Sequence, residues 1–225
     1  MYPQLTIHAL YDLQYTIAAP LLAEHQYPWE ALGQIGDFIE RLGPTLPEEE
    51  YECPHEGVWI HKTAIVAPSA FLGNRIIVGA GAEIRHCAFL RGNAIVGCDA
   101  VVGNSTELKN VILFDRVQVP HYNYVGDSIL GYCAHMGAGS ITSNVKSDKT
   151  PTTVAVNGER AETGLKKCGA MLGDHVEIGC GSVLNPGTVI GPRSSVYPLS
   201  MVRGYVPADS IYKHQGEIAQ KQSSV

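Results

Sequence analysis

The amino-acid sequence predicts an all-β fold, a left-handed parallel β-helix built from hexapeptide repeats. An aliphatic or apolar residue returns at every sixth position over ten consecutive steps. A small or β-branched residue often stands four places after it, and glycine often follows it directly. An α-helix repeats after about 3.6 residues and a β-strand after two, so neither explains a period of six. The periodic positions are Ile60, Val66, Leu72, Val78, Ile84, Leu90, Val96, Val102, Leu108, Phe114 and Pro120.

A chain that turns a corner after every hexad explains this repeat. Three hexads close a coil of about 18 residues, and their aliphatic side chains point into a triangular prism and stack from coil to coil. The phase breaks after Pro120, the next periodic positions run from Tyr124 to Thr142, and the repeat resumes at Leu172. The 18 hexads counted in this way predict about six coils within residues 58–206.

Residues 1–57 do not follow the repeat and form a predicted helical segment. Tyr27-Pro28-Trp29 opens the clearest helix, because proline suits the first helical turn. We expect this helix to run from Trp29 to Leu42, to end at Gly43-Pro44, and to cover the open end of the solenoid. The stretch from Ala9 to Glu24 remains ambiguous, since Pro20 interrupts any helix there.

The repeat also disappears in an insertion over residues 143–169. Thr153 to Val156 reads as a strand, and Asn157-Gly158 is a strong hairpin signal, so we expect a two-stranded arm. A long insertion in a solenoid is usually functional or an interaction arm. The polar tail, residues 207–225, is expected to form at most a short helix.

Composition excludes several classes of function. The 225-residue chain has a net charge of −6 and a pI near 5.8, which does not suggest a nucleic-acid surface. No apolar run approaches the roughly 20 residues of a membrane span, and the N-terminus lacks a secretory pattern. The six cysteines show no CxxC spacing, so we expect reduced thiols in a cytoplasmic protein.

Coil geometry converts sequence spacing into proximity. Arg91 and Lys109 are separated by three hexads, the length of one coil, and each follows an inward aliphatic residue. They should therefore point outward from neighbouring coils, one above the other. Two stacked cations repel unless an anion lies between them, and a phosphate suits a guanidinium and an ammonium. Two solvated surface cations remain the alternative.

His121 lies where the repeat breaks and is a candidate general base. Glu107, two residues before Lys109, could support the imidazole from the neighbouring coil. A polar surface histidine is the simpler alternative. A zinc site of the three-histidine kind would call for two histidines five apart on the solenoid, which the sequence lacks, so we predict no metal.

Three motifs in order and spacing carry a resemblance to a known family. They are Gly103–Asn110 (GNSTELKN), Val119–Ile129 (VPHYNYVGDSI) and Met136–Asn144 (MGAGSITSN). This run resembles the acetyltransferase domain of the bifunctional N-acetylglucosamine-1-phosphate uridyltransferase/glucosamine-1-phosphate N-acetyltransferase family. The helix after Tyr27, the Asn157-Gly158 hairpin and the segment 163–174 resemble its archaeal-type sugar-nucleotidyltransferase relatives.

The resemblance implies roles for ten residues. It makes His121 the catalytic base and Glu107 the acid that pairs with it. The positions that it implies for the amino-sugar 1-phosphate are Arg91, Lys109, Tyr124, His135, Asn144 and, approximately, Lys167. Cys180 and Pro198 fall where the family faces acetyl-CoA, the expected co-substrate. The family further implies a homotrimer with the active site between two prisms.

Departures from the family pattern bear on the substrate. His135 stands where the bacterial family has asparagine, and Cys180 where it has serine. Residues 1–57 are too few for the family's uridyltransferase domain, so we expect no uridyl transfer. The predicted function is acetyl-CoA-dependent N-acetylation of an amino-sugar 1-phosphate in nucleotide-sugar biosynthesis. The alternatives are an O-acyltransferase on a sugar or nucleotide sugar and a non-catalytic sugar-phosphate-binding or oligomerisation module.

Overall fold

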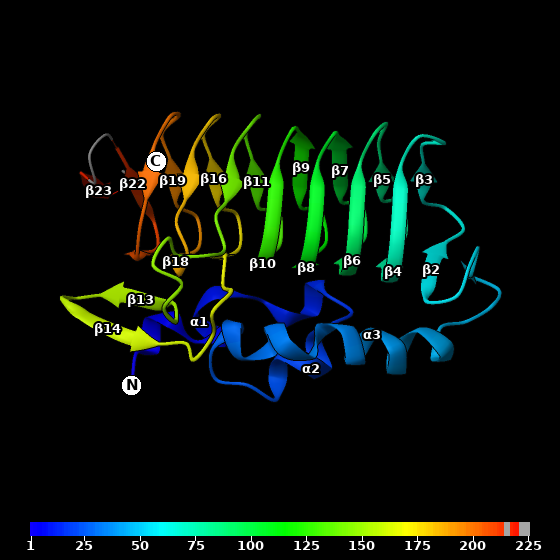
Figure 1. Cartoon of the computed structure of the whole chain (residues 1–225), viewed down its shortest axis with the longest axis horizontal. Coiled ribbons are helices and arrows are strands. Elements are labelled where there is room, and N and C mark those ends of the chain that lie inside the picture. Colours follow the sequence, from blue (N-terminus) through cyan, green and yellow to red (C-terminus); the bar gives the residue numbers. More distant parts are fainter. Residues whose placement is uncertain (214–216, 221–225) are drawn as a thin grey trace, which may run out of the picture.

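The computed structural model describes residues 1–213 and 217–220 and confirms the left-handed parallel β-helix (Figure 1). A 12-stranded sheet folds over two faces of the prism, and a 9-stranded sheet forms the remaining face. The 12-stranded sheet comprises β1 (Tyr51–Glu52), β2 (Val58–His61), β4 (Phe71–Val78), β6 (Phe89–Val96), β8 (Glu107–Leu113), β10 (Tyr124–Leu130), β12 (Ile141–Thr142), β15 (Ala170–Leu172), β17 (Val183–Leu184), β18 (Thr188–Ile190), β20 (Met201–Val202) and β21 (Tyr205–Val206).

The 9-stranded sheet forms what we call face 2. It comprises β3 (Ile65–Val66), β5 (Glu83–Ile84), β7 (Val101–Asn104), β9 (Gln118–His121), β11 (His135–Met136), β16 (Glu177–Ile178), β19 (Ser195–Val196), β22 (Ser210–Tyr212) and β23 (Ile218–Gln220). All but the antiparallel β23 are parallel strands of successive coils, so this face has eight rungs within the described residues. The hexad count, which predicts about six coils, is therefore too low.

The repeat changes phase earlier than the sequence indicates. Neighbouring coils keep the spacing of three hexads up to the pair Leu90–Leu108, but the register then shifts and Gly92 pairs with Lys109. From there to the insertion the sequence separation of paired residues is shorter by one, as in Val102–Val119. The inward positions are consequently Leu113, Val119 and Val125, and the predicted Phe114, Pro120 and Tyr124 are each displaced by one. The cause is a short step in β8, where the inward residues Leu108 and Leu113 are five positions apart instead of six, so that Arg91 of β6 has no partner in β8.

The N-terminal segment lies along the prism rather than over its end (Figure 1). Its ordered turns are η1 (Pro3–Leu5), α1 (Ile7–Leu10), η2 (Leu13–Tyr15), α2 (Ala19–Ala23), η3 (Pro28–Gln34), α3 (Ile35–Leu42) and η4 (Gly43–Thr45). The predicted helix is thus 3₁₀ in its first half and α-helical in its second, and α3 packs on β4, β6 and β8. None of the described helices is long and apolar enough to cross a membrane.

One outward row of apolar residues explains this position. The 12-stranded sheet covers two faces of the prism. Face 1 consists of β2, β15, β18, β21 and the C-terminal halves of β4, β6, β8 and β10, and face 3 consists of β12, β17, β20 and the N-terminal halves of the same four strands. Strand side chains alternate between the interior and the outer surface, and the outward row on face 1 pairs from coil to coil in register. Its members are Trp59, Ile77, Ile95, Ile112, Ile129, Met171, Val189 and Tyr205. The central four are at most 1% exposed, because the N-terminal segment covers them. The N-terminal segment therefore covers the centre of face 1.

The corresponding row on face 3 is open. It consists of Phe71, Phe89, Glu107, Tyr124, Ile141, Val183 and Met201. Phe71 is 59% exposed and Met201 67%, so the apolar members of this row face solvent in one chain.

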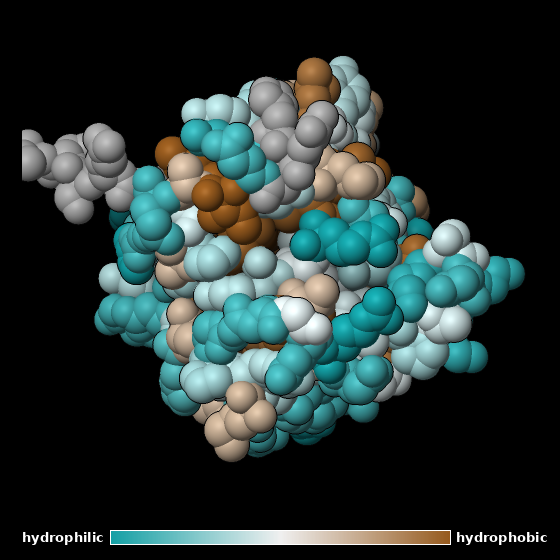
Figure 2. All heavy atoms as spheres, turned by 90° about the vertical axis from the view of Figure 1, so that its left-hand side faces the viewer, coloured by the Kyte–Doolittle hydropathy of each residue, from teal (hydrophilic) through white to brown (hydrophobic). Residues whose placement is uncertain are grey.

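The predicted hairpin in the insertion is confirmed as β13 (Thr153–Val156) and β14 (Glu159–Glu162). The parallel stack continues past residue 206, because β22 pairs with β19. The short helix expected in residues 207–225 falls partly on residues 214–216 and 221–225, outside the described residues; the described part forms β22 and β23. Figure 2 views this end of the solenoid, where hydrophobic residues gather in the upper middle and hydrophilic residues cover most of the rest.

Candidate functional site

His121 lies on the edge between faces 2 and 3, which we call the His121 edge. At this edge, the backbone N–H of the residue after each corner donates to the carbonyl of the corner residue in the preceding coil. These hydrogen bonds stack the corner residues of successive coils, which are His86, Asn104, His121, Ala138 and Cys180. Pro198 follows on the next rung after Cys180. The structure therefore brings the predicted base and both predicted cofactor residues to one edge of the prism.

The imidazole of His121 is exposed, and its side chain makes no hydrogen bond or ion pair with the described residues. Its backbone, by contrast, is held by Asn123, whose Oδ1 accepts the His121 N–H at 3.1 Å. The Asn123 amide is buried and donates to the carbonyls of Gly137 and Ser140 at 2.9 and 3.1 Å. His121 thus presents an available nitrogen on a fixed backbone. Sequence reasoning did not assign Asn123, although its place two residues after His121 is visible in the motif.

Glu107 does not contact His121 among the described residues. In the strand register it lies beside Tyr124, three residues after His121. Its Oε1 accepts a hydrogen bond from Arg91 Nη1 at 2.9 Å, and this bond is the main cause that raises the pKa of Arg91. The predicted Glu107–His121 pair is therefore replaced in this structure by a Glu107–Arg91 pair.

Arg91 and Lys109 do not stack directly, because the register shift places Gly92 opposite Lys109. Both nevertheless line one cavity of about 300 Å³ together with Arg75. Lys109 Nζ lies 2.7 Å from Asp127 Oδ1 and 2.9 Å from Oδ2. Each predicted phosphate-binding cation already has a carboxylate partner, so an incoming phosphate would have to share or displace Glu107 and Asp127.

Asp127 organises the cluster on face 3. Its side chain is only 5% exposed, and besides Lys109 it accepts hydrogen bonds from the Nδ2 atoms of Asn110 and Asn144, at 3.0 and 2.5 Å. Asn144 Nδ2 also donates to the Tyr124 hydroxyl at 3.2 Å. Burial raises the pKa of Tyr124, so the phenol stays protonated and can donate to a ligand.

Sequence reasoning missed Asp127, although a usable signal existed. Asp127 follows Lys109 by three hexads, the same spacing that brought Arg91 and Lys109 together in the prediction. The remaining predicted substrate-binding residues, Lys167 and His135, lie in different places. Lys167 precedes Cys168, whose N–H donates to the Asn144 carbonyl at 3.0 Å, and thus lies beside the cluster.

His135 lies apart from the cluster. It stands on β11 of face 2, where its Nδ1 is 2.8 Å from Glu177 Oε2. Tyr124 and Asn144, in contrast, contact each other on the side of face 3. Within one prism His135 and Tyr124 cannot line the same pocket. No group of three metal-ligating side chains that could hold an ion occurs among the described residues.

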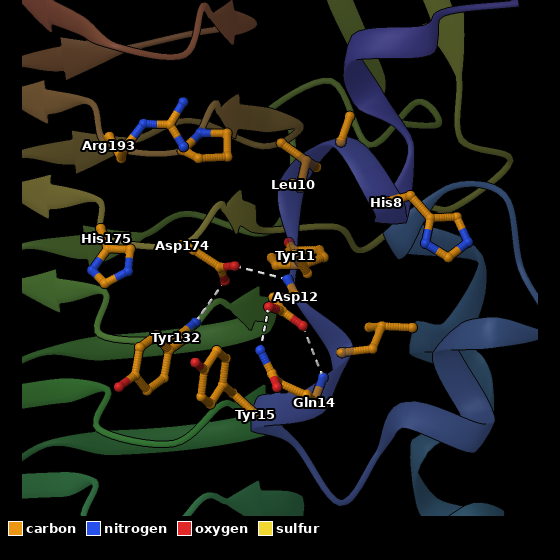
Figure 3. Close-up of a pocket in the computed structure, with 13 residues that line it drawn as sticks. His8, Leu10, Tyr11, Asp12, Gln14, Tyr15, Tyr132, Asp174, His175 and Arg193 are labelled. Atoms are coloured by element: carbon orange, nitrogen blue, oxygen red, sulfur yellow. Dashed lines mark hydrogen bonds between the residues drawn. The ribbon is translucent and has the colours of Figure 1, made fainter.

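A cavity of about 700 Å³ contains none of the predicted residues (Figure 3). It lies where the segment from His8 to Tyr15 meets the edge between faces 1 and 2. Asp174 accepts the backbone N–H groups of Asp12 and Tyr132 at 2.7 and 2.8 Å, and the rings of Tyr15 and Tyr132 stack at 3.8 Å. These contacts fasten the N-terminal segment to the solenoid.

No family model matches the chain. It is 30% identical over 199 residues to a bifunctional protein GlmU from Methanococcus vannielii, covering 87% of this chain and 48% of the relative. It is 28% identical over 182 residues to a bifunctional sugar-1-phosphate nucleotidylyltransferase/acetyltransferase from Sulfurisphaera tokodaii, covering 81% and 42%. The chain spans about half the length of the curated relatives it matches.

Two solved structures were also similar to the chain. A hexapeptide transferase family protein from Anaplasma phagocytophilum matches with TM-score 0.43 and 17% identity, over 74% of this chain and 81% of that one. The acetyltransferase domain of PglB from Neisseria gonorrhoeae, in complex with acetyl coenzyme A, matches with TM-score 0.31 and 17% identity, over 70% and 54%.

Proposed function

We propose that this chain, a relative of the bifunctional GlmU proteins over their acetyltransferase part, is an acetyl-CoA-dependent N-acetyltransferase. The kinship confirms the resemblance that the motifs predicted. The acceptor in this proposal is an amino-sugar 1-phosphate. The observation that carries it is the combination of an unengaged His121 and, on the adjoining face 3, the polar cluster of Lys109, Tyr124, Asp127 and Asn144.

In the proposed reaction His121 removes a proton from the sugar amine. The amine nitrogen then forms a bond to the thioester carbonyl carbon, the carbon–sulfur bond breaks, and the coenzyme thiolate leaves and takes up the proton. A phosphate that binds the Arg91 guanidinium would compete with Glu107 for it. Such competition would release the Glu107 carboxylate, which could then stabilise the imidazolium.

The proposed assembly is a homotrimer whose site forms between two prisms. His135 and Tyr124 belong to different faces, so both can line one site only if face 2 of one copy meets face 3 of the next. Face 1 is covered by the N-terminal segment, and face 3 carries exposed apolar residues such as Phe71. A head-to-tail contact of two different faces closes into a ring when the rotation permits.

The test of the reaction is release of free thiol from acetyl-CoA with a panel of amino-sugar phosphates. His121→Ala should lower the rate by roughly 10²–10⁴, the usual contribution of a general base. His86→Ala is the matched control, because His86 is a histidine of the same edge two rungs away. Full activity of His121→Ala would exclude the assigned base. Acylation of hydroxyl acceptors without any amine acetylation would instead indicate an O-acyltransferase.

A separate measurement tests whether acetyl-CoA binds along the His121 edge. The Cys180 thiol is exposed in one chain, on the same edge as His121. Acetyl-CoA bound along that edge should protect Cys180 from alkylation by iodoacetamide, whereas the exposed Cys53, far from the edge, should react equally with and without it. Equal modification of Cys180 at saturating acetyl-CoA would contradict the placement.

A further inference from the structure

The insertion forms a second basic cavity, which the proposed reaction does not use. This cavity has a volume of about 460 Å³ and lies between the segment Ser143–Asp148, the hairpin β13–β14 and the last coils. Its lining includes Lys146, Arg160 and Arg203 against the one acidic residue Asp148. A positive cavity is unexpected in a chain of net charge −6.

The two arginines are brought together by close backbone packing. A Cβ on Gly204 would lie 2.6 Å from the Ala155 carbonyl oxygen, and one on Gly187 would lie 2.6 Å from that of Thr153. Glycine at these positions, with φ of +77° and +76°, therefore lets β13 rest directly on the coil corners. Ala155 is the cross-strand partner of Arg160, so the hairpin brings Arg160 to the cavity that Arg203 also lines.

Neither guanidinium has an ion-pair partner within residues 1–213 and 217–220. Lys146, by comparison, lies 3.6 Å from Asp148 Oδ2 and donates to Thr150. Most other arginines of the solenoid are neutralised, as in Arg91–Glu107 and Arg193–Asp209. Two unpaired cations held together by the backbone are unfavourable unless an anion lies between them, and a guanidinium binds phosphate oxygens in bidentate fashion.

The cavity adjoins the acceptor cluster. Register stacks Lys109, Gly126, Ser143, Asn185 and Arg203 along one edge of the prism, so Lys109 and Arg203 are four rungs apart, about 19 Å at ~4.8 Å per rung. Asn144, which contacts Asp127 and the Tyr124 hydroxyl, is flanked by the cavity residues Ser143 and Val145. A single inorganic phosphate would leave most of the cavity unfilled, because pockets of about 300–1,000 Å³ take whole organic ligands.

We propose that this cavity is a subsite for the phosphate groups of a nucleotide, with Arg160 and Arg203 as its ligands. Two sources supply that chemistry: the nucleotide part of a nucleotide-linked amino-sugar acceptor, and the phosphorylated adenosine of coenzyme A. Its position beside Asn144, on the opposite edge of face 3 from His121 and Cys180, favours the acceptor. The choice of these two nucleotide sources rests on the proposed function, whereas the binding of nucleotide phosphates to the subsite does not.

Direct binding is the first test, by titration calorimetry with uridine diphosphate and with adenosine 3′,5′-bisphosphate. At least one should bind the unmodified protein, and Arg160→Gln/Arg203→Gln should weaken that binding by roughly 10- to 100-fold, as expected for two charge-assisted contacts. Arg41→Gln/Arg85→Gln removes the same number of charges elsewhere and should leave binding unchanged. Absence of binding by both nucleotides, or equal weakening by both double variants, would overturn the proposal.

Kinetics then distinguish the sources. If the acceptor fills the subsite, the Arg160/Arg203 variant should raise KM for the uridine-diphosphate ester of the amino sugar and leave KM for its 1-phosphate unchanged. If coenzyme A fills it, KM should rise for acetyl-CoA more than for acetyl-dephospho-CoA. Calorimetry measures binding without turnover, so it tests the subsite even if the protein has no acetyltransferase activity. In that case, weaker nucleotide binding by the Arg160→Gln/Arg203→Gln variant would support the subsite, although the proposed reaction would be refuted.

Discussion

Replacing Asp127 by asparagine removes the charge that holds the face 3 cluster together. The carboxylate is 5% exposed and its partner Lys109 26% exposed, with 2.7 and 2.9 Å between Nζ and the two oxygens. Breaking a buried pair from one side costs about 3–5 kcal/mol, and the partial exposure of Lys109 favours the lower end, about 3 kcal/mol. For a chain of this size that loss corresponds to a fall in Tm of about 6–12 °C.

A double-mutant cycle measures the pair itself. Lys109→Met removes the ammonium, and the double variant Asp127→Asn/Lys109→Met leaves a neutral cluster in which the new amide oxygen can still accept from one of the two amides, Asn110 or Asn144, that now donate to the two carboxylate oxygens. The double variant should therefore recover part of the stability lost by Asp127→Asn, giving a coupling energy of about 2 kcal/mol from urea unfolding curves. A coupling energy below about 0.5 kcal/mol would refute the claim that this ion pair organises the cluster.

Self-association, backbone packing and thiol burial allow three further tests. Phe71→Glu/Phe89→Glu charges the exposed row of face 3 and should yield monomers in light scattering with an unchanged circular dichroism spectrum; an intact trimer would contradict that interface. Gly103→Ala places a Cβ far inside the contact distance of the Pro120 carbonyl oxygen in the next coil. We therefore expect this variant to lose more than about 4 kcal/mol of unfolding free energy in denaturant titrations. A native-like midpoint would disprove this close packing. Burial raises the pKa of Cys168 to about 12, so the thiolate is scarce at lower pH. At about pH 8, iodoacetamide should therefore modify the exposed Cys53 but not Cys168, as measured by mass spectrometry. Equal labelling of the two thiols would contradict this expectation.

Much of the candidate site follows from spacing, because a solenoid turns sequence separation into contact. The register pairs Leu90 with Leu108, as the hexad period requires. The same coil geometry brings Tyr124 and Asn144 together, with a 3.2 Å hydrogen bond between them. The hairpin at Asn157-Gly158 was also predictable, since its turn chemistry is local.

Other features depend on interactions that no repeat records. The step from Leu108 to Leu113 is one residue shorter than a hexad, and it moves the inward position from the predicted Phe114 to Leu113. A period read from aliphatic residues tolerates such a slip where two apolar residues adjoin, as at Leu113 and Phe114. The partner of Glu107 was likewise decided in three dimensions, where Arg91 lies within hydrogen-bond reach.

The sequence by itself determined the prism, the edge that carries His121 and the insertion, because each arises from contacts between neighbouring coils or within one turn. Only the tertiary structure decided which face the N-terminal segment covers. Ile77, Ile95 and Ile112 point outward in a row that the inward repeat does not distinguish. Burying that row drives the segment along face 1, since apolar area removed from water is the main stabilising contribution available to it.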